Sequence, residues 1–501
     1  MDIAEPASIE FDRAGLKAAS RKAIVISYLS QAAKFVIQFL YTITMARLLT
    51  PADFGVVGMA APLLAFATLL ADVGLSQAAI QNQNLSNQQL SFLFWMNLGV
   101  TTILASVIVV SAPLVASFYH EPRVAPVVAI LGALMIIGPL GSQHSVLLNR
   151  NFAFGKLAAV ELTSLVTGTI AGVAAALGGL GIWSIILNQA TGAVVALLML
   201  WLGVRWRPSA LKRGVISDVR HLLHFGANVA TFNIFNFLAR NIDAVLIGRA
   251  WGEVQLGIYT RAYSLLLLPL NQIMVPISKV ALPLLSRIQN EPGPYRIAFW
   301  KMLDLALLLV FPVSLFSLVA HQQLINIVLG QKWEAAGPIF GILSIGALFA
   351  PISHSANWLL LSQGRGRELR QYGMISSIGF TIAIVAGLPG GPLGVASAYI
   401  GFGVVQGPIL WSLITKTGPV NTKSLFLGLL PYLFASLPVV LLLYALQSVM
   451  PPKIWSLLFM LVLSYGVFAA ILALTPHGRN RLLDLVAEAR HLVSGMRVAR
   501  G

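Results

Sequence analysis

Long apolar segments recur along most of the chain, from about residue 24 to residue 475, and each is bounded by Gly, Pro or charged residues. Fourteen of them are candidates for membrane-crossing helices, which need roughly 20 apolar residues. Of the 501 residues, 57% are hydrophobic and only 10% are charged, which is more apolar surface than a soluble chain of this length can bury. Barrel strands would be short and alternating. The sequence therefore predicts an all-α polytopic membrane protein.

The boundaries of the fourteen predicted spans follow from these apolar runs. They are residues 24–47, 55–80, 91–118, 124–148, 157–178, 181–204, 222–250, 254–285, 298–320, 335–362, 371–388, 392–415, 424–447 and 453–475. The first twenty residues lack the basic-then-apolar order of a cleavable signal peptide, so we expect the first span to be its own insertion signal. The chain contains no cysteine, which excludes disulfides, thiol catalysis and thiolate metal sites.

The basic residues predict the orientation. With fourteen spans, 24 Lys and Arg residues near the span ends fall on one side of the membrane and five on the other, namely Arg47, Arg123, Arg249, Lys332 and Lys453. Because cytoplasmic loops carry an excess of Lys and Arg, we expect both termini in the cytoplasm. Because the basic residues lie in loops between the spans, we interpret the net charge of +16 as a determinant of membrane orientation and not as a sign of nucleic-acid binding.

Two groups of residues recur between the halves of the chain, at offsets of 202 and 212 positions. Arg47, Gly55, Ala60 and Pro139 in the first half correspond to Arg249, Gly257, Ala262 and Pro351 in the second. The recurrence predicts that spans 1–6 and spans 7–12 are two copies of one six-helix lobe, with spans 13 and 14 appended. Parallel repeats with a substrate site between them are a transporter architecture.

The predicted domains follow these repeats: a cytoplasmic N-terminal segment at 1–23, an N-lobe at 24–204, a basic cytoplasmic linker at 205–221, a C-lobe at 222–415, two further spans within 424–475 and a tail at 476–501. In the tail, apolar residues from Leu482 to Met496 repeat at helical spacing, with arginines elsewhere around the helix. This pattern predicts a basic amphipathic helix on the cytoplasmic leaflet, with a solvated tail as the alternative.

Familiar enzyme motifs are missing from the sequence. It has no phosphate loop ending in Gly-Lys-Ser/Thr, no His-Glu-x-x-His motif and no nucleotide-binding domain, so the chain is not expected to hydrolyse ATP. The predicted external loops are short, which disfavours a membrane polymerase or glycosyltransferase. We expect a transporter rather than an enzyme, without a cofactor or metal.

Several ionisable residues lie at membrane depth, where each costs roughly 2.5 to 3.5 kcal/mol and should face a partner or a watery cavity. They are Lys34, Asp72, Glu161, Arg240, Asp243, Arg261, Lys279 and Asp304. Lys34 is near the midplane, about 18 Å from either end of its span at 1.5 Å per residue. Its side chain either pairs with Asp72 of the next span or lines a cavity and binds an anionic group.

Other charged residues also leave two interpretations open. Arg240 and Asp243 are three positions apart on one helix, where they could neutralise each other, or Arg240 could bind an anion. Arg261 lies between two tyrosines that are typical either of a binding site or of an interfacial aromatic belt. Lys279 is a weaker candidate, whereas Glu161 and Asp304 are near cytoplasmic ends and are interpreted as structural. We interpret His354 as a packing residue, with proton coupling as the alternative.

An ordered series of motifs runs over roughly residues 25–365. They are Arg47–Gly55, Asp72–Ser76, Phe94–Asn97, Arg240–Asp243, Ile247–Arg249, Leu256–Tyr259, Arg261–Tyr263, Pro269, Ser286–Gln289, Phe311–Pro312 and Leu329–Trp333. Together they resemble the polysaccharide transport family of Wzx-like oligosaccharide flippases, part of the multidrug/oligosaccharidyl-lipid/polysaccharide (MOP) exporter superfamily.

The resemblance implies two six-helix lobes around a central cavity that opens alternately to the two sides of the bacterial cytoplasmic (inner) membrane. The implied substrate is an undecaprenyl-diphosphate-linked oligosaccharide for lipopolysaccharide, capsule or exopolysaccharide synthesis. A sugar chain and a diphosphate cannot cross hydrocarbon unaided, so fixed cations would shield the diphosphate while the polyprenyl tail stays in membrane lipid. A polysaccharide polymerase and other assembly proteins are the implied partners.

On this hypothesis Lys34, Arg240 and Arg261 shield the diphosphate. Asp72 and Asp243 are the carboxylates assigned either to coupling with H⁺ or Na⁺, the expectation within the superfamily, or to ion pairs with those cations. The alternatives are a multidrug or organic-cation antiporter of the same superfamily, a membrane-embedded polymerase or glycosyltransferase, and a non-transporting scaffold for polysaccharide assembly.

Overall fold

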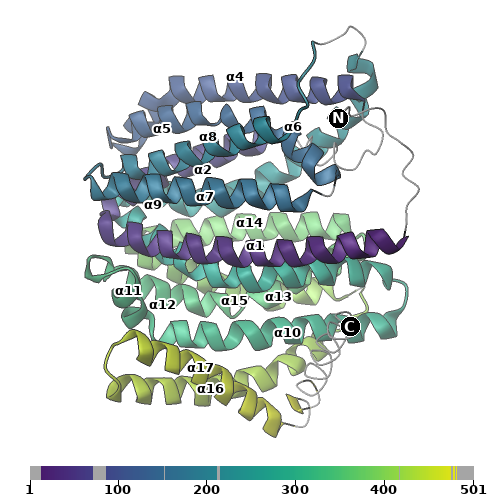
Figure 1. Ribbon diagram of the computed structural model, residues 1–501. Coiled ribbons are helices and arrows are strands. Elements are labelled where there is room, and N and C mark those ends of the chain that lie inside the picture. Colours follow the sequence, from purple (N-terminus) through teal and green to yellow (C-terminus); the bar gives the residue numbers. More distant parts are fainter. Residues whose placement is uncertain are drawn as a thin grey trace. The chain divides into compact units, whose positions relative to one another are not determined.

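Most of the chain that the structure describes is helical (Figure 1). The structure is a computed structural model, and it describes residues 13–71, 86–151, 153–210, 215–416, 418–475, 478–479 and 481, with side chains left out at 13–28 and 215–240. No strand occurs among these residues. The prediction of an all-α protein is confirmed.

The chain divides into two compact units, residues 1–234 and 235–501. The helices of unit 1 are α1 (Arg13–Leu48), α2 (Pro51–Ala71), α4 (Asn87–Tyr119), α5 (Val124–Leu134), α6 (Ile137–Arg150), α7 (Phe154–Leu177) and α8 (Trp183–Gly203). The long α9 (Val215–Arg287) begins in unit 1 and continues into unit 2. Within unit 1, α1 packs against α7, α7 against α8, and α4 against α2 and α5.

The remaining helices of unit 2 are α10 (Pro292–Val319), α11 (His321–Val328), α12 (Ala336–Ala347), α13 (Ala350–Ser362), α14 (Gly366–Gly387), α15 (Gly391–Ile414), α16 (Thr422–Val449) and α17 (Ile454–Leu474). Two short 3₁₀ helices, η1 (Gln331–Trp333) and η2 (Leu388–Gly390), lie between them. The core of the unit is α10, which packs against α12, α13, α16 and α17 and carries fully buried Phe299 and Leu307. The appended last two spans thus belong to unit 2.

All fourteen predicted spans correspond to described helices. By length and hydropathy, ten helices of the described residues can cross a membrane, or eleven if the bent α12–α13 pair is one span. One of the ten, residues 366–414, contains both α14 and α15, and the count leaves out α1 and the first part of α9. The predicted seventh and eighth spans are both in α9, on either side of Gly252, whose φ of 78° interrupts the helix. The protein is a multi-pass membrane protein.

Corresponding spans of the two halves each consist of two consecutive helices that meet at corresponding places. Span 4 consists of α5 and α6, with Pro139 in the first turn of α6. Span 10 consists of α12 and α13, with Pro351 in the first turn of α13 and a bend of 40° between the helices. Proline is tolerated in a first turn and disfavours the helix before it. The repeated prolines of the sequence therefore mark the same structural feature in both units.

A capping box begins the second span. Thr50 precedes α2, and its backbone N–H and hydroxyl donate to the Asp53 carboxylate at 2.9 and 2.7 Å. The Asp53 N–H donates back to the Thr50 hydroxyl at 3.3 Å, and Pro51 occupies the first helical position. These contacts form a tight polar turn between the first two spans.

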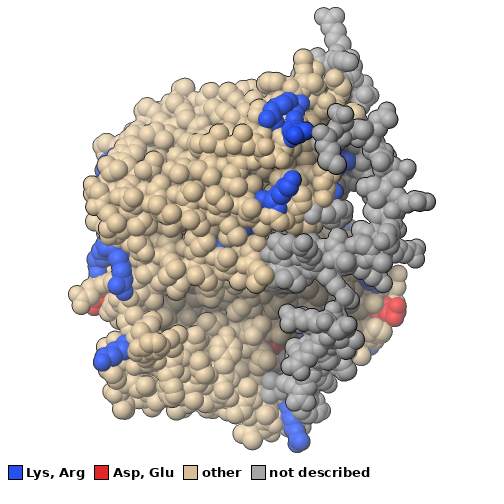
Figure 2. Space-filling model, viewed as in Figure 1, with Lys and Arg blue, Asp and Glu red and all other residues tan. Residues whose placement is uncertain are grey.

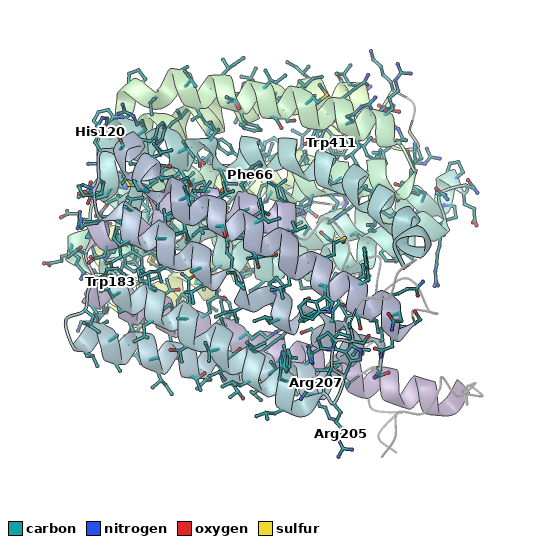
Figure 3. All side chains as sticks on the ribbon, turned by 90° about the horizontal axis from the view of Figure 1, so that it is seen from above. Phe66, His120, Trp183, Arg205, Arg207 and Trp411 are labelled. Atoms are coloured by element: carbon teal, nitrogen blue, oxygen red, sulfur yellow. The ribbon has the colours of Figure 1, made fainter. Side chains whose placement is uncertain are left out.

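The two ends of unit 1 differ in the residues they carry. In Figure 3, His120 and Trp183 lie at one end, and Arg205 and Arg207 lie at the other. The connections that carry these two pairs therefore lie at opposite ends of the helices of unit 1. On the face drawn in Figure 2, Lys and Arg are few and most of them lie near the helix ends.

Some boundaries and elements differ from prediction. The first helix begins at Arg13 and α9 at Val215, so the predicted N-terminal segment and linker are partly helical. The short α11 and η1 in the connection between spans 9 and 10 had no apolar run to indicate them. The amphipathic tail helix predicted within 476–501 lies outside the described residues, apart from 478–479 and 481.

Candidate functional site

Lys34, the cation predicted near the midplane, forms an ion pair with Glu161. Lys34 is on α1, Glu161 is on α7, and the two side chains are 26% and 45% exposed. Glu161 had been interpreted as structural and was not assigned to Lys34, whereas the predicted partner, Asp72, lies outside the described residues. Because both side chains remain partly exposed, a ligand that entered beside α1 and α7 could reach the pair.

Asp243 is held by a tyrosine from the other side of the Gly252 break. The Tyr259 hydroxyl donates to one Asp243 carboxylate oxygen at 2.8 Å, and the Ala244 N–H donates to the other at 2.8 Å. In an unbroken helix, residues 16 apart would be about 24 Å apart. The hydrogen bond therefore requires the chain to fold back at Gly252.

Tyr259 and Tyr263 form a stacked pair next to Arg261. Their ring centroids are 6.2 Å apart with an interplanar angle of 5°, and Tyr259 is only 3% exposed. Such burial argues against an interfacial belt at Tyr259, because a belt residue would face the membrane surface. Arg261 itself is half-buried on α9.

The structure describes three of the five predicted site residues with their side chains. Lys34 is in unit 1, whereas Asp243 and Arg261 are in unit 2. Arg240 lies on α9 with its side chain outside the description, and Asp72 is not described. The predicted diphosphate site thus remains a proposal for all three cations.

Asp304 is the centre of a buried polar cluster in unit 2. It accepts hydrogen bonds from the Tyr432 hydroxyl and the Arg481 guanidinium, both at 2.9 Å, and it is 4% exposed. The Arg481 guanidinium also lies 5.0 Å from the ring centroid of Trp300 and donates to the Gly428 carbonyl at 3.2 Å. These contacts fasten the residues after α17 to α10 and α16, a structural role that agrees with the interpretation of Asp304.

A second feature of unit 2 is a cavity of about 310 Å³, which we call the unit 2 cavity. It is lined by residues of α9, α12, α13, α14 and α15 and by Phe349. Its aromatic and polar lining consists of Tyr263, Phe349, Ser353, His354, Tyr372, Ser376, Phe380, Tyr399, Gln406 and Trp411. Among these only His354 and Tyr263 had been singled out in the sequence, because aromatic residues of membrane spans carry no signal that separates cavity-facing from lipid-facing positions.

Metal ligands are not grouped in the described part of the chain: no three His, Cys, Asp or Glu side chains there lie close enough together to hold an ion.

Helices of membrane-spanning length in two compact units define the protein as a polytopic all-α membrane protein. A family model described as "Polysaccharide biosynthesis protein" matches residues 44–338. This is more than half of the chain, and the chain belongs to that family. The family match confirms the predicted place among polysaccharide biosynthesis and transport proteins.

Two relatives and one solved structure illustrate the similarity. The lipopolysaccharide biosynthesis protein WzxC of Escherichia coli (strain K12) is 24% identical over 412 residues, which cover 81% of this chain and 83% of WzxC. The succinoglycan biosynthesis transport protein ExoT of Rhizobium meliloti (strain 1021) is 25% identical over 473 residues, covering 93% and 94%. Lipid II flippase MurJ in its inward closed conformation aligns with a TM-score of 0.71 over 90% of this chain and 99% of MurJ, at 16% identity. The chain shares the MurJ fold.

Proposed function

We propose that the chain is a flippase that moves polyprenyl-diphosphate-linked oligosaccharide units across the bacterial cytoplasmic membrane by alternating access. The observation that carries this proposal is the combination of two matches. The chain belongs to a polysaccharide biosynthesis family, and its fold over 90% of its length is that of a protein named as a lipid II flippase. A relative that covers 93% of the chain is named as a transport protein for succinoglycan biosynthesis.

The proposed substrate fits the residues physically. A diphosphate loses its hydration in hydrocarbon, and cationic side chains compensate that loss through charge-assisted hydrogen bonds. We assign this role to Lys34, Arg240 and Arg261. The partial exposure of Lys34 supports the assignment, because a sealed ion pair could not exchange its carboxylate for a phosphate oxygen. Asp72 and Asp243 are the proposed residues for coupling to H⁺ or Na⁺.

The proposed orientation has both termini in the cytoplasm. Because the chain contains no cysteine, single-cysteine variants can be labelled without first removing native thiols. His120 and Arg205 are exposed and lie at opposite ends of unit 1 (Figure 3). A membrane-impermeant maleimide added to intact spheroplasts should label His120→Cys and spare Arg205→Cys until the membrane is opened. The reverse pattern would contradict the orientation.

The function itself is tested in a strain from which the gene is deleted. We expect surface polymer to disappear and lipid-linked oligosaccharide to accumulate on the inner leaflet, and the wild-type gene should reverse both effects. A deletion strain that delivers polymer normally and accumulates no lipid-linked intermediate would refute the proposal. Restored resistance to organic cations, without any effect on polymer, would favour the antiporter instead.

A further inference from the structure

The unit 2 cavity has one wall made of flat aromatic rings. The Phe380 and Tyr399 rings, from α14 and α15, are stacked with centroids 4.4 Å apart at an angle of 28°. Tyr372 and Trp411 line the same cavity from the same two helices, and Trp411 is labelled in Figure 3. Aromatic faces bind apolar C–H surfaces well and offer a polar edge when the ring is Tyr or Trp.

A polar strip lies beside these rings. The Gln406 side chain, 6% exposed in all, donates its amide N–H to the Ser376 hydroxyl at 2.9 Å. Ser376 also hydrogen-bonds with Tyr372, so an amide and two hydroxyl groups form one connected set at the cavity wall. Groups of this kind act as both donors and acceptors, which is what a ligand bearing several hydroxyl groups requires.

The lining carries little charge. None of the described residues that line the cavity is Asp, Glu, Lys or Arg, and His354 is its one imidazole. A diphosphate would lack the cations that it needs there, and an organic cation would lack a carboxylate. The lining therefore suits a neutral ligand with one apolar face and many hydroxyl groups, and a pyranose ring has that chemistry.

The size of the cavity limits such a ligand to about one ring. Its 310 Å³ is roughly ten times the ~30 Å³ that a water molecule occupies in the liquid. This volume is at the lower end of ordinary ligand sites, ~300 to 1,000 Å³. Phe349 and Ser353 line the cavity and are exposed, so the cavity is open on that side.

We propose that the unit 2 cavity binds one uncharged sugar ring of the glycan carried by the substrate, separately from the cations assigned to the diphosphate. This inference rests on the proposed function, because the glycan is part of the substrate proposed there. Free glycosides can test it, since they present the same ring as the lipid-linked glycan. It predicts that filling the cavity will weaken both the binding of uncharged glycosides and the export of polymer.

Two glycines of α15 provide a matched pair of variants. A Cβ at Gly403, which lines the cavity, would lie 3.8 Å from the Phe380 ring, an ordinary contact, so that a longer side chain would occupy the cavity. A Cβ at Gly401 would meet no atom within 4 Å, and Gly401 does not line the cavity. Gly403→Leu therefore fills the cavity, while Gly401→Leu makes the same change elsewhere on the same helix. Tyr399→Ala removes the aromatic wall, with the exposed Tyr444→Ala on α16 as its control.

Binding is measured on the full-length protein in lipid nanodiscs by saturation-transfer NMR. The probes are the methyl glycosides of glucose, galactose and N-acetylglucosamine, with tetraphenylphosphonium as the organic-cation comparison. We expect at least one glycoside to bind wild-type protein, Gly401→Leu and Tyr444→Ala alike, and to bind Gly403→Leu and Tyr399→Ala roughly tenfold or more weakly. In the deletion strain, the two cavity variants should export less polymer than their controls.

The outcomes separate this inference from the proposed function. If the wild-type gene restores export while Gly403→Leu restores it equally well and binds glycosides unchanged, the sugar site is refuted and the flippase proposal stands. A cavity that binds tetraphenylphosphonium but no glycoside, or neither probe, also refutes the sugar site. If deletion of the gene leaves export unaffected, the flippase proposal fails. If Gly401→Leu reduces export as much as Gly403→Leu does, the variants act on folding, and the export result then counts against the sugar site.

Discussion

The Lys34 ammonium donates to the Glu161 carboxylate, and this contact joins the first helix of unit 1 to α7. The two residues are 127 positions apart in the chain. Near the membrane midplane an unpaired charge costs roughly 2.5 to 3.5 kcal/mol, so the pair lowers the cost of placing both charges there. Both side chains are nevertheless partly exposed, which leaves the lysine accessible to a substrate.

Lys34→Met should reduce polymer export roughly tenfold or more while the protein remains inserted, because one of the cations proposed to shield the diphosphate is lost. Glu161→Gln should retain most export, since the lysine keeps its charge. The measurement is surface polymer in the complemented deletion strain, normalised to the amount of membrane-inserted protein.

The swapped pair Lys34→Glu with Glu161→Lys distinguishes the two roles of Lys34. If the cation contacts substrate from α1, the swap should stay inactive although the ion pair is rebuilt. Full recovery of export by the swap would show that the contact between the helices is what matters, and Lys34 would then be a structural residue.

Tyr259→Phe should lower the stability of the protein by about 1 to 3 kcal/mol, because it removes a hydrogen bond to a partly buried carboxylate. Asp243→Asn keeps an amide oxygen that can accept the bond from Tyr259, but it loses the bond from the Ala244 N–H and should therefore also be somewhat destabilising. The measurement is thermal unfolding of the purified protein in detergent, with the exposed Tyr444→Phe as the control. Equal unfolding temperatures for Tyr259→Phe and Tyr444→Phe would contradict the importance of this bond at the Gly252 turn.

Asp243→Asn also tests ion coupling. The variant keeps the hydrogen bond from Tyr259 but cannot carry a negative charge, so transport driven through this carboxylate should stop although the protein still folds. Transport in reconstituted vesicles under an imposed H⁺ or Na⁺ gradient provides the measurement. Gradient-dependent transport at the wild-type rate would exclude Asp243 from coupling.

Arg481→Met should be strongly destabilising, by about 3 to 5 kcal/mol, because it leaves the buried Asp304 carboxylate without its cation. Arg479→Met, at an exposed position two residues earlier, is the matched control and should have little effect. The double variant Asp304→Asn with Arg481→Met should recover part of the loss, since no buried charge is then left uncompensated. If Arg481→Met and Arg479→Met unfold at the same temperature, the contact between Arg481 and Asp304 does not hold this part of the chain.

The sequence predicted those features that depend on neighbouring residues. Apolar runs predicted the helices, and recurring residues such as Pro139 and Pro351 predicted the correspondence between the two halves. Contacts between helices that are far apart in the sequence could not be predicted from neighbouring residues. The pairing of Lys34 with Glu161 is set by the crossing of α1 and α7, and the same apolar pattern would have allowed Asp72.

The unit 2 cavity shows the same limit. Gln406, Tyr399 and Trp411 are on one helix, and their spacing does not reveal that they approach Tyr372 and Phe380 of α14. One cue was local: Gly252 lies between two spans close to the repeated arginine and glycine, and its positive φ is the kind of conformation that glycine adopts readily.

Close packing of α7 against α8 yields a final prediction. Gly168 and Gly172 are four residues apart on α7, and a Cβ at Gly168 would lie 2.7 Å from the Asn188 carbonyl oxygen of α8 and 3.4 Å from the Gly192 backbone. Small residues at this spacing let membrane helices approach closely. The added methyl would meet backbone rather than a flexible side chain, so one helix must move.

Gly168→Ala should therefore destabilise the protein by about 1 to 3 kcal/mol, the usual cost of overpacking, even though Ala is the better helix former by roughly 1 kcal/mol. Gly99→Ala on α4 is the control, because a Cβ there meets no atom within 4 Å. We expect thermal unfolding to show a lower transition for Gly168→Ala and an unchanged or higher one for Gly99→Ala. A higher transition for both would mean that helix propensity outweighs the contact, and that α7 and α8 are not packed at van der Waals distance.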